Sequence, residues 1–299
     1  MASREHATEA LRRSLQDSLG RLLDPAPAAR VASGQIGECV RWSGDGGDLF
    51  VKLAPVERRP VFEAEVAGLE ELDAARAIRV PAVLGTGIAG PQAWLALGWI
   101  DLAAPGVRCE ASLGEQLASL HRVGAARFGW HRDNTIGATP QRNPWDDDWA
   151  RFFVRHRLTA QLDLAAANGA SARLLDRGRV LCEIAGALFS SYRPAPSLLH
   201  GDLWGGNWAA DASGEPVVFD PAVYFGDREA DIAMTRLFGG FGPAFYAAYQ
   251  SEWPLDQAAG TRRTFYNLYH VLNHYNLFGG GYAAQAEAMI GRLLGELGH

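Results

Sequence analysis

The hydrophobic pattern of this 299-residue chain changes near residue 101. Up to that point, short apolar runs alternate with turns rich in Gly and Pro, a pattern typical of antiparallel strands. From residue 112 onward, apolar residues recur mostly at three- and four-residue spacing, which predicts helices. We therefore expect an α+β fold with two lobes, a small β-rich lobe over residues 1–101 and a larger, mainly helical lobe over residues 102–299.

The expected small lobe contains two helices and four strands. The helices are predicted over residues 8–23 and 60–76, and the strands over 31–40, 49–53, 80–84 and 94–97. The first two strands form a predicted hairpin around the glycine-rich turn 43–47. In the large lobe we expect helices over 113–123, 144–168, 170–192 and several from 231 to 297, with loop and short strands between 200 and 220.

The bulk composition excludes several classes of protein. Hydrophobic residues make up 48% of the chain and charged residues 21%, as in ordinary globular proteins. A net charge of −6 argues against a general nucleic-acid binder. The N-terminus is polar, no apolar run is long enough to span a membrane, and Cys39, Cys109 and Cys182 lack metal-ligand spacing. We expect a cytoplasmic protein with reduced thiols and no membrane partner, present as a monomer or weak dimer.

One stretch of the large lobe carries the residue types that phosphoryl transfer requires. It reads LLHGDLWGGN over 198–207 and VVFDP over 217–221. Asp202 is the expected base for an acceptor hydroxyl, while Asn207 and Asp220 are expected to hold Mg²⁺ on the phosphates of a nucleotide. The turn 211–214 between them predicts a hairpin that returns Asp220 to Asn207. His200 is expected to stabilise the loop backbone.

The small lobe offers a nucleotide site to match. Lys52 lies on a predicted strand, and Glu65 follows thirteen residues later on a predicted helix, where the two side chains can form an ion pair. In the preceding loop, the backbone N–H groups of Gly34 and Gly37 are expected to approach phosphate oxygens, with a simple hairpin bend as the alternative. The loop is not a GxxxxGK[ST] motif, which argues against a P-loop NTPase. These parts indicate a kinase-like architecture, with the nucleotide between the lobes.

Together these residues resemble the fructosamine kinase (ketosamine 3-kinase) family, a branch of the aminoglycoside-phosphotransferase-like kinases within the protein-kinase-like superfamily. The resemblance covers nearly the whole chain. Trp204 inside the catalytic loop and Asp-Pro-Ala in place of Asp-Phe-Gly point to this branch. The motifs that carry the resemblance are LHGDLW at 199–204, DPA at 220–222, DIAM at 231–234, LFGGF at 237–241, LFGGGY at 277–282, DNTIG at 133–137 and WARFF at 149–153.

The resemblance implies ATP-dependent phosphorylation of O3′ of a ketosamine such as ribulosamine or fructosamine, a reaction of the protein-deglycation type. It gives Asp202 the role of base, Asn207 and Asp220 the role of Mg²⁺ ligands, and Lys52 with Glu65 the phosphate contact. The ketosamine is a small molecule or is bound to a protein. The alternatives are a kinase for another hydroxylated amine, such as an aminoglycoside or a choline analogue, and a kinase-like binding module without turnover.

Two residues are expected to contact the acceptor. Trp204, close to the base, can stack on the sugar carbons or bind the ammonium group by a cation–π contact. His274 lies on an aromatic helical face that lines either the acceptor cleft or the core.

Asp231 is expected to accept hydrogen bonds from N–H groups of the catalytic loop. Gln35 replaces the cysteine that makes some relatives redox-sensitive, and Cys39 is four residues further on, which argues against a disulfide between loops.

Overall fold

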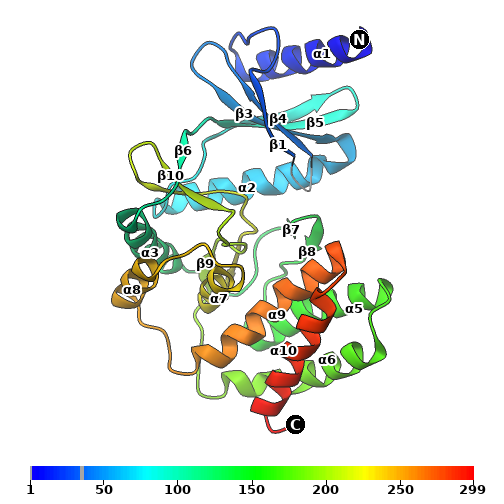
Figure 1. Ribbon diagram of the computed structural model, residues 1–299, viewed down its shortest axis with the longest axis vertical. Helices are drawn as coiled ribbons and strands as arrows, with labels where there is room; N and C mark the ends of the chain where they lie inside the picture. Colours follow the sequence, from blue (N-terminus) through cyan, green and yellow to red (C-terminus); the bar gives the residue numbers. More distant parts are fainter. Residues whose placement is uncertain (1, 34–36) are drawn as a thin grey trace.

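The structure is a computed structural model and describes residues 2–33 and 37–299 (Figure 1). A sheet flanked by helices α1 and α2 occupies one end of the molecule, and a group of helices occupies the other. The small β-rich region and the larger helical region predicted from the sequence are both present. Within the described residues, no helix is long and apolar enough to cross a lipid bilayer.

The small region is built on an antiparallel sheet of five strands in the order β1-β2-β3-β5-β4. The strands are β1 (Ala29–Ser33), β2 (Glu38–Trp42), β3 (Leu49–Pro55), β4 (Val83–Ala89) and β5 (Gln92–Gly98). The prediction of one strand over 31–40 is therefore wrong, because this stretch contributes to two strands that pair with each other. The predicted strand at 80–84 begins only at Val83, two residues after Pro81.

Alternation along β3 decides where its functional side chain points. Leu49, Val51 and Leu53 are buried in a small core beneath α1 (Ala2–Leu19). Lys52 lies between them in sequence, so its side chain projects from the opposite face of the sheet. That face is covered by α2 (Arg59–Ala75), the helix expected to carry Glu65.

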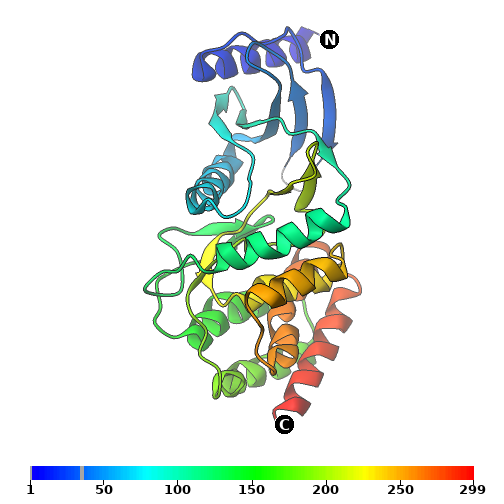
Figure 2. The ribbon, with the colours of Figure 1, turned by 90° about the vertical axis from the view of Figure 1, so that its left-hand side faces the viewer.

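The large region is mainly helical (Figures 1 and 2). Its helices are α3 (Val107–His121), α4 (Trp149–Phe153), α5 (Ala160–Ala167), α6 (Ala172–Ile184), α7 (Glu229–Leu237), α8 (Pro243–Glu252), α9 (Ala259–Phe278) and α10 (Tyr282–Glu296). The helix predicted over 144–168 starts later, at Trp149, because Asp148 caps it by accepting a hydrogen bond from the Arg151 N–H at 2.7 Å. It is also interrupted by a π-helical segment, Val154–Thr159.

Short strand pairs carry the loops of the large region. The predicted hairpin before Asp220 is present as β10 (Trp208–Asp211) paired with β11 (Pro216–Val218), and β6 (Leu102–Ala103) extends it. The remaining pairs are β7 (Asn134–Ile136) with β8 (Thr139–Gln141) and β9 (Ser197–Leu199) with β12 (Tyr224–Gly226).

Helices α3 and α8 lie side by side and approach closely at one glycine (Figure 2). A Cβ atom added to Gly114 would collide with the Phe245 carbonyl oxygen and lie 3.0 Å from the Tyr249 nitrogen. A Cβ atom added to Gly260, at the start of α9, would meet no atom within 4 Å. The two glycines therefore have different reasons to be there, although both are helical.

We predict that Gly114→Ala destabilises the protein by about 1–3 kcal/mol, because the backbones of α3 and α8 must move apart. The matched control Gly260→Ala should be neutral or stabilising by up to about 1 kcal/mol, because alanine favours the helix and has room. Urea unfolding followed by circular dichroism measures both. Equal effects of the two substitutions would contradict the close packing at Gly114.

Candidate active site

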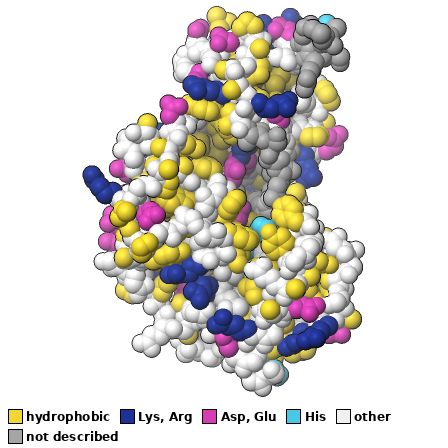
Figure 3. Space-filling model, in the orientation of Figure 1, with side chains coloured by type: hydrophobic (Ala, Val, Ile, Leu, Met, Phe, Trp, Pro, Cys, Tyr) yellow, Lys and Arg dark blue, Asp and Glu magenta, His cyan; other side chains and the backbone are white. Residues whose placement is uncertain are grey.

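A cavity of about 400 Å³ lies where the sheet region meets the helical region. The space-filling view shows the hollow between the two regions (Figure 3). Every predicted site residue that the structure describes lines this cavity: Gly37, Lys52, Glu65, Asp202, Trp204, Asn207, Asp220 and His274. Gly34 lies outside the described residues.

Lys52 joins two acidic side chains that come from distant parts of the chain. Its Nζ lies 2.6 Å from Oε1 of Glu65 on α2, so the predicted ion pair is present. It also forms an ion pair with the carboxylate of Asp220. Burial opposes the charge on Lys52, but the two carboxylates outweigh it and raise the pKa of the ammonium group. The ammonium group is therefore charged and held in the wall of the cavity.

Asp202 has a proton affinity suited to exchange near neutral pH. Burial, followed by repulsion from Asp220, raises the pKa of Asp202 to about 7. Asn207 partly offsets this, since its Nδ2 donates to the Asp202 main-chain oxygen at 2.8 Å and to Oδ2 at 3.3 Å. A carboxyl group whose pKa lies near the working pH accepts a proton efficiently and can release it again.

Asn207 and Asp220 present the oxygen donors that a magnesium ion prefers. The Nδ2 of Asn207 also donates to the Asp220 main-chain oxygen at 3.4 Å, which places the two residues side by side. Asp220 has a φ of 55°, in the left-handed region that Asp adopts more readily than most residues other than glycine, and its carboxylate is half-exposed. The described residues contain no group of three or more His, Cys, Asp or Glu placed to hold a metal. Mg²⁺ fits such a sparse set, since phosphates and water commonly complete its shell.

The loop that carries Asp202 is fixed by Asp231, on the first turn of α7. The carboxylate of Asp231 accepts hydrogen bonds from the His200 N–H at 2.7 Å and the Gly201 N–H at 2.9 Å, as predicted. Burial alone would raise the pKa of Asp231, but a hydrogen bond from His121 and these N–H groups lower it below its usual range. His200 donates from Nε2 to the Phe219 main-chain oxygen at 3.0 Å, so it ties the loop to the segment before Asp220.

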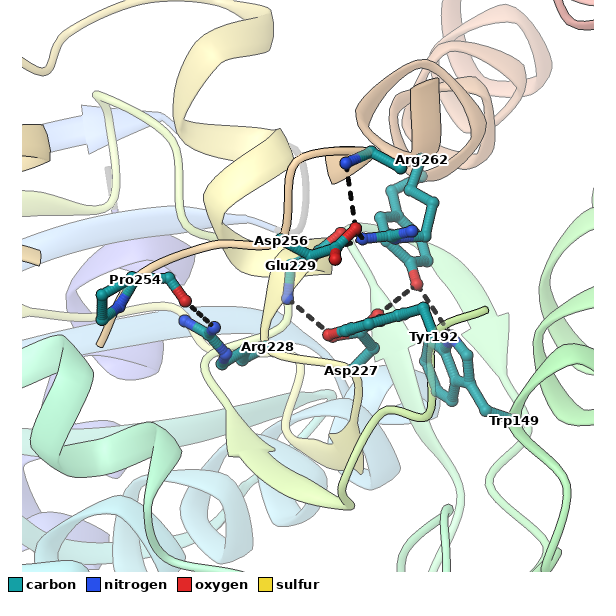
Figure 4. Close-up of polar contacts among 10 residues, drawn as sticks. Trp149, Tyr192, Asp227, Arg228, Glu229, Pro254, Asp256 and Arg262 are labelled. Carbon is teal, nitrogen blue, oxygen red and sulfur yellow. Dashed lines mark hydrogen bonds and ion pairs between the residues drawn. The ribbon is translucent and has the colours of Figure 1, made fainter. Parts of the chain in front are cut away.

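A buried ionic cluster behind this loop fixes the start of α7 (Figure 4). Asp227 accepts hydrogen bonds from the hydroxyls of Tyr192 and Tyr266 and from the Glu229 N–H. Glu229 pairs with Arg262 of α9 through two contacts of 2.8 and 3.0 Å. Burial and then Glu229 raise the pKa of Asp227 to about 6. The cluster was missed by sequence reasoning, because its members are far apart in the chain.

The chain after Asp220 is fixed by amide side chains of the β7–β8 pair. Asn134 donates to the Val223 main-chain oxygen at 2.7 Å, and Gln141 donates to the Ala222 main-chain oxygen at 3.1 Å. Just before β7, the indole N–H of Trp130 donates to Glu71 of α2 at 3.1 Å. The same segment therefore contacts both α2 and the stretch between Asp220 and β12. Of these residues, only Asn134 was noted in the sequence, as part of the motif DNTIG at 133–137.

Aromatic and polar side chains from α9 and its neighbours complete the cavity. Trp204 is 38% exposed, and its ring packs edge-on against Phe238 at 6.4 Å between centroids. The His274 ring lies 4.7 Å from Phe238, which joins the two predicted acceptor residues in one aromatic group. His270 and Asn273 also line the cavity. Sequence reasoning placed His270 in the core, although its helical spacing from His274 put both on one face.

Comparison with known proteins shows what the chain is similar to. A sequence model of the fructosamine kinase family matches residues 7–296. The chain is 46% identical over 246 residues to a probable ketoamine kinase of Synechocystis sp., covering 82% of each protein. It is 40% identical over 263 residues to protein-ribulosamine 3-kinase, chloroplastic, of Arabidopsis thaliana, covering 87% of this chain and 80% of that protein. The crystal structure of a candidate fructosamine-3-kinase from Thermobifida fusca matches with a TM-score of 0.86 at 29% identity, covering 96% of this chain and 99% of that one.

We predict that Asp202→Asn stabilises the protein at pH 8 by about 1–3 kcal/mol in the absence of metal and nucleotide. The pKa of Asp202 is raised to about 7 in the folded protein, above its value of about 3.9 in an unfolded chain. Ionisation of Asp202 therefore lowers the free energy of unfolding. The whole of this loss is present above pH 7, and it disappears as the pH falls toward 4. The gain from Asp202→Asn should shrink accordingly between pH 8 and pH 5.

Urea unfolding in the presence of a chelator, repeated across that pH range, measures this gain. The exposed Asp176→Asn is the matched control and should change stability by less than about 0.5 kcal/mol at every pH. A gain that is absent, or one that does not vary with pH, would show that Asp202 has an ordinary pKa.

Proposed function

Because the chain belongs to the fructosamine kinase family, we propose that it is an ATP-dependent kinase that phosphorylates the O3′ hydroxyl of a ketosamine such as ribulosamine or fructosamine. The observation that carries the proposal is that the ion pair Lys52–Glu65 and the group Asp202, Asn207 and Asp220 line a single cavity. Its two-lobed fold is protein-kinase-like. Residues 1–101 act as the nucleotide-binding lobe and residues 102–299 as the catalytic and acceptor-binding lobe.

The nucleotide occupies the side of the cavity formed by the sheet. Lys52 contacts the α- and β-phosphates, the backbone at Gly34 and Gly37 approaches the phosphate oxygens, and Glu65 keeps Lys52 oriented. When a phosphate oxygen takes the place of the Asp220 carboxylate at Lys52, Asp220 becomes available as a metal ligand beside Asn207. Asn207 and Asp220 would hold Mg²⁺ there, and the bound ion would supply charge neutralisation at the phosphate oxygens.

Asp202 orients the acceptor hydroxyl and takes its proton. As the O3′ oxygen forms a bond to the γ-phosphorus, the bond from that phosphorus to the β-phosphate bridging oxygen breaks and ADP leaves. The proton of the hydroxyl passes to the Asp202 carboxylate, whose raised pKa favours its acceptance near neutral pH. Trp204 and His274 contact the sugar and the amine-bearing part of the acceptor.

The proposal also covers the location of the protein, its acceptor and its oligomeric state. The three cysteines are free, which suits the reducing cytoplasm that we propose as the location. The acceptor is a free or protein-bound ketosamine, and the protein acts as a monomer or weak dimer. The complete set of Lys52, Glu65, Asp202, Asn207 and Asp220 argues against a binding module without turnover.

We predict that the purified protein with MgATP converts ribulosamine or fructosamine to a phosphorylated sugar and ADP. Asp202→Asn should lower kcat by about 10²- to 10⁴-fold, because the hydroxyl loses its proton acceptor. ADP release, measured across ketosamines, aminoglycosides and choline, tests the acceptor class, and titration with ATP checks that the variant still binds nucleotide. Turnover of an aminoglycoside or choline without turnover of any ketosamine contradicts the proposal, as does a fully active Asp202→Asn.

We further predict that Glu65→Gln lowers kcat/KM for ATP by about 10- to 100-fold, because Lys52 loses the partner that orients it toward phosphate. The matched control is Glu63→Gln on the same helix, since Glu63 pairs with Arg59 at the surface and not with Lys52. Steady-state kinetics with varied ATP measure both, and KM for the acceptor should stay unchanged in each. Equal kinetics for the two variants would remove Glu65 from the nucleotide site.

A further inference from the structure

One face of α9 lines the cavity along its length. His270, Asn273, His274 and Leu277 all border it, and their spacing of three, four and seven residues places them on one side of the helix. The same cavity contains Asp202 and Trp204. This face is therefore part of the space in which the acceptor must lie.

His270 differs from the other buried histidines of the described chain. His121 uses both ring nitrogens, with Nδ1 2.8 Å from the Tyr249 hydroxyl and Nε2 3.2 Å from Asp231. His200 also uses both, through the Phe219 main-chain oxygen and the Asp202 N–H. His270 is only 5% exposed, yet its ring makes no hydrogen bond to any residue that the structure describes.

The ring nitrogens of His270 are open to the cavity and are not sealed in the core. They are not among the fully buried side-chain atoms without a partner, which in the described residues are Thr139 Oγ1, Arg157 Nε, Arg262 Nη1 and Asn267 Oδ1. A polar group at the wall of a cavity can form hydrogen bonds with water or with a bound ligand. Because the His270 ring borders the cavity, a molecule bound there can supply the missing partner. Among the described residues, the neighbouring His274 directs Nδ1 to the His270 main-chain oxygen at 2.9 Å and does not bond to the His270 ring.

The protonation state of His270 fits one kind of partner. Burial, and then the neighbouring His274, lower the pKa of His270 to about 3, so the ring is neutral near pH 7. A neutral imidazole has one donor and one acceptor nitrogen, and a hydroxyl group likewise donates and accepts. A neutral ring also places no positive charge next to the cationic amine of a ketosamine.

Neighbouring contacts fix the rotation of α9 and so keep His270 at the cavity. The Tyr269 hydroxyl donates to Gln141 at 2.8 Å, and Asn273 accepts from Gln161 at 3.2 Å. Both partners lie in other parts of the large region, on β8 and α5. The helix therefore cannot turn His270 into the core without breaking buried hydrogen bonds on either side of it.

We propose that His270 is a specificity-determining residue that hydrogen-bonds a hydroxyl group of the ketose chain other than the one phosphorylated. The inference rests on the proposed function and adds that this site recognises a second hydroxyl group of the acceptor. Asp202 engages O3′, Trp204 and His274 contact the carbon skeleton and the amine, and His270 selects for a second hydroxyl.

The test compares His270→Phe, which removes the hydrogen-bonding groups, with His270→Asn, which keeps one donor and one acceptor. We expect His270→Phe to raise KM for a ketosamine by about 10-fold or more while KM for ATP changes by less than about twofold. His270→Asn should recover part of the loss. The matched control His156→Phe changes a half-buried histidine that does not border the cavity, and its KM values should match the wild type.

Ketosamines that each lack one hydroxyl identify the partner. The wild type should discriminate against one of them, and His270→Phe should treat that analogue and the complete ketosamine alike. An unchanged KM for the ketosamine in His270→Phe overturns the inference. An equal rise of this KM in His270→Phe and His270→Asn, accompanied by weaker ATP binding, overturns it as well. If His270→Phe does not fold, the analogue series with wild type and His270→Asn decides. Wild-type protein that turns over no ketosamine refutes the proposed function itself, a separate outcome.

Discussion

The ion pairs of Lys52 connect the parts of this molecule on which its chemistry depends. Lys52 comes from the sheet, Glu65 from α2, and Asp220 from the far end of the β10–β11 hairpin. A buried ammonium group is stable only with such partners, so the sheet, the helix and the catalytic segment must meet at one point. The contact between the two regions therefore also positions these three side chains in the cavity.

The catalytic loop has a second, independent support. Asp231 fixes the backbone at His200 and Gly201, and the cluster of Asp227, Glu229 and Arg262 fixes the helix that carries Asp231. Each of these acids is buried and fully partnered, which makes the arrangement rigid but sensitive to the loss of any member. The backbone next to Asp202 is thus fixed by contacts on the α7 side of the loop. Burial and the nearby Asp220 raise the pKa of the Asp202 carboxyl group.

Sequence reasoning located the residues whose meeting depends on local geometry. The period of a strand placed Lys52 on one face, the following helix brought Glu65 to it, and a short hairpin returned Asp220 to Asn207. It failed where the outcome depends on contacts between distant segments. The pairing of Glu229 with Arg262 and the position of the His270 ring have no local pattern that reveals them, because each is decided by what packs against it. The split of residues 31–40 into two strands is a different kind of error, since the hairpin bend considered at Gly34 and Gly37 was a local signal for it.

The charged and the neutral side chains of the cavity are suited to different parts of the substrates. Lys52 faces two carboxylates, and Asp202 adds a third that is partly ionised near neutral pH, so negative charge outweighs positive charge where the reaction takes place. Such an excess favours a metal-bound nucleotide over a free one and an acceptor that carries an ammonium group. Hydroxyl groups are uncharged, so these charged residues do not distinguish one hydroxyl from another. Neutral hydrogen-bond donors and acceptors must recognise the hydroxyl groups of the acceptor. His270, the one buried imidazole of the described chain without a hydrogen bond to another described residue, lies where an acceptor hydroxyl can reach it.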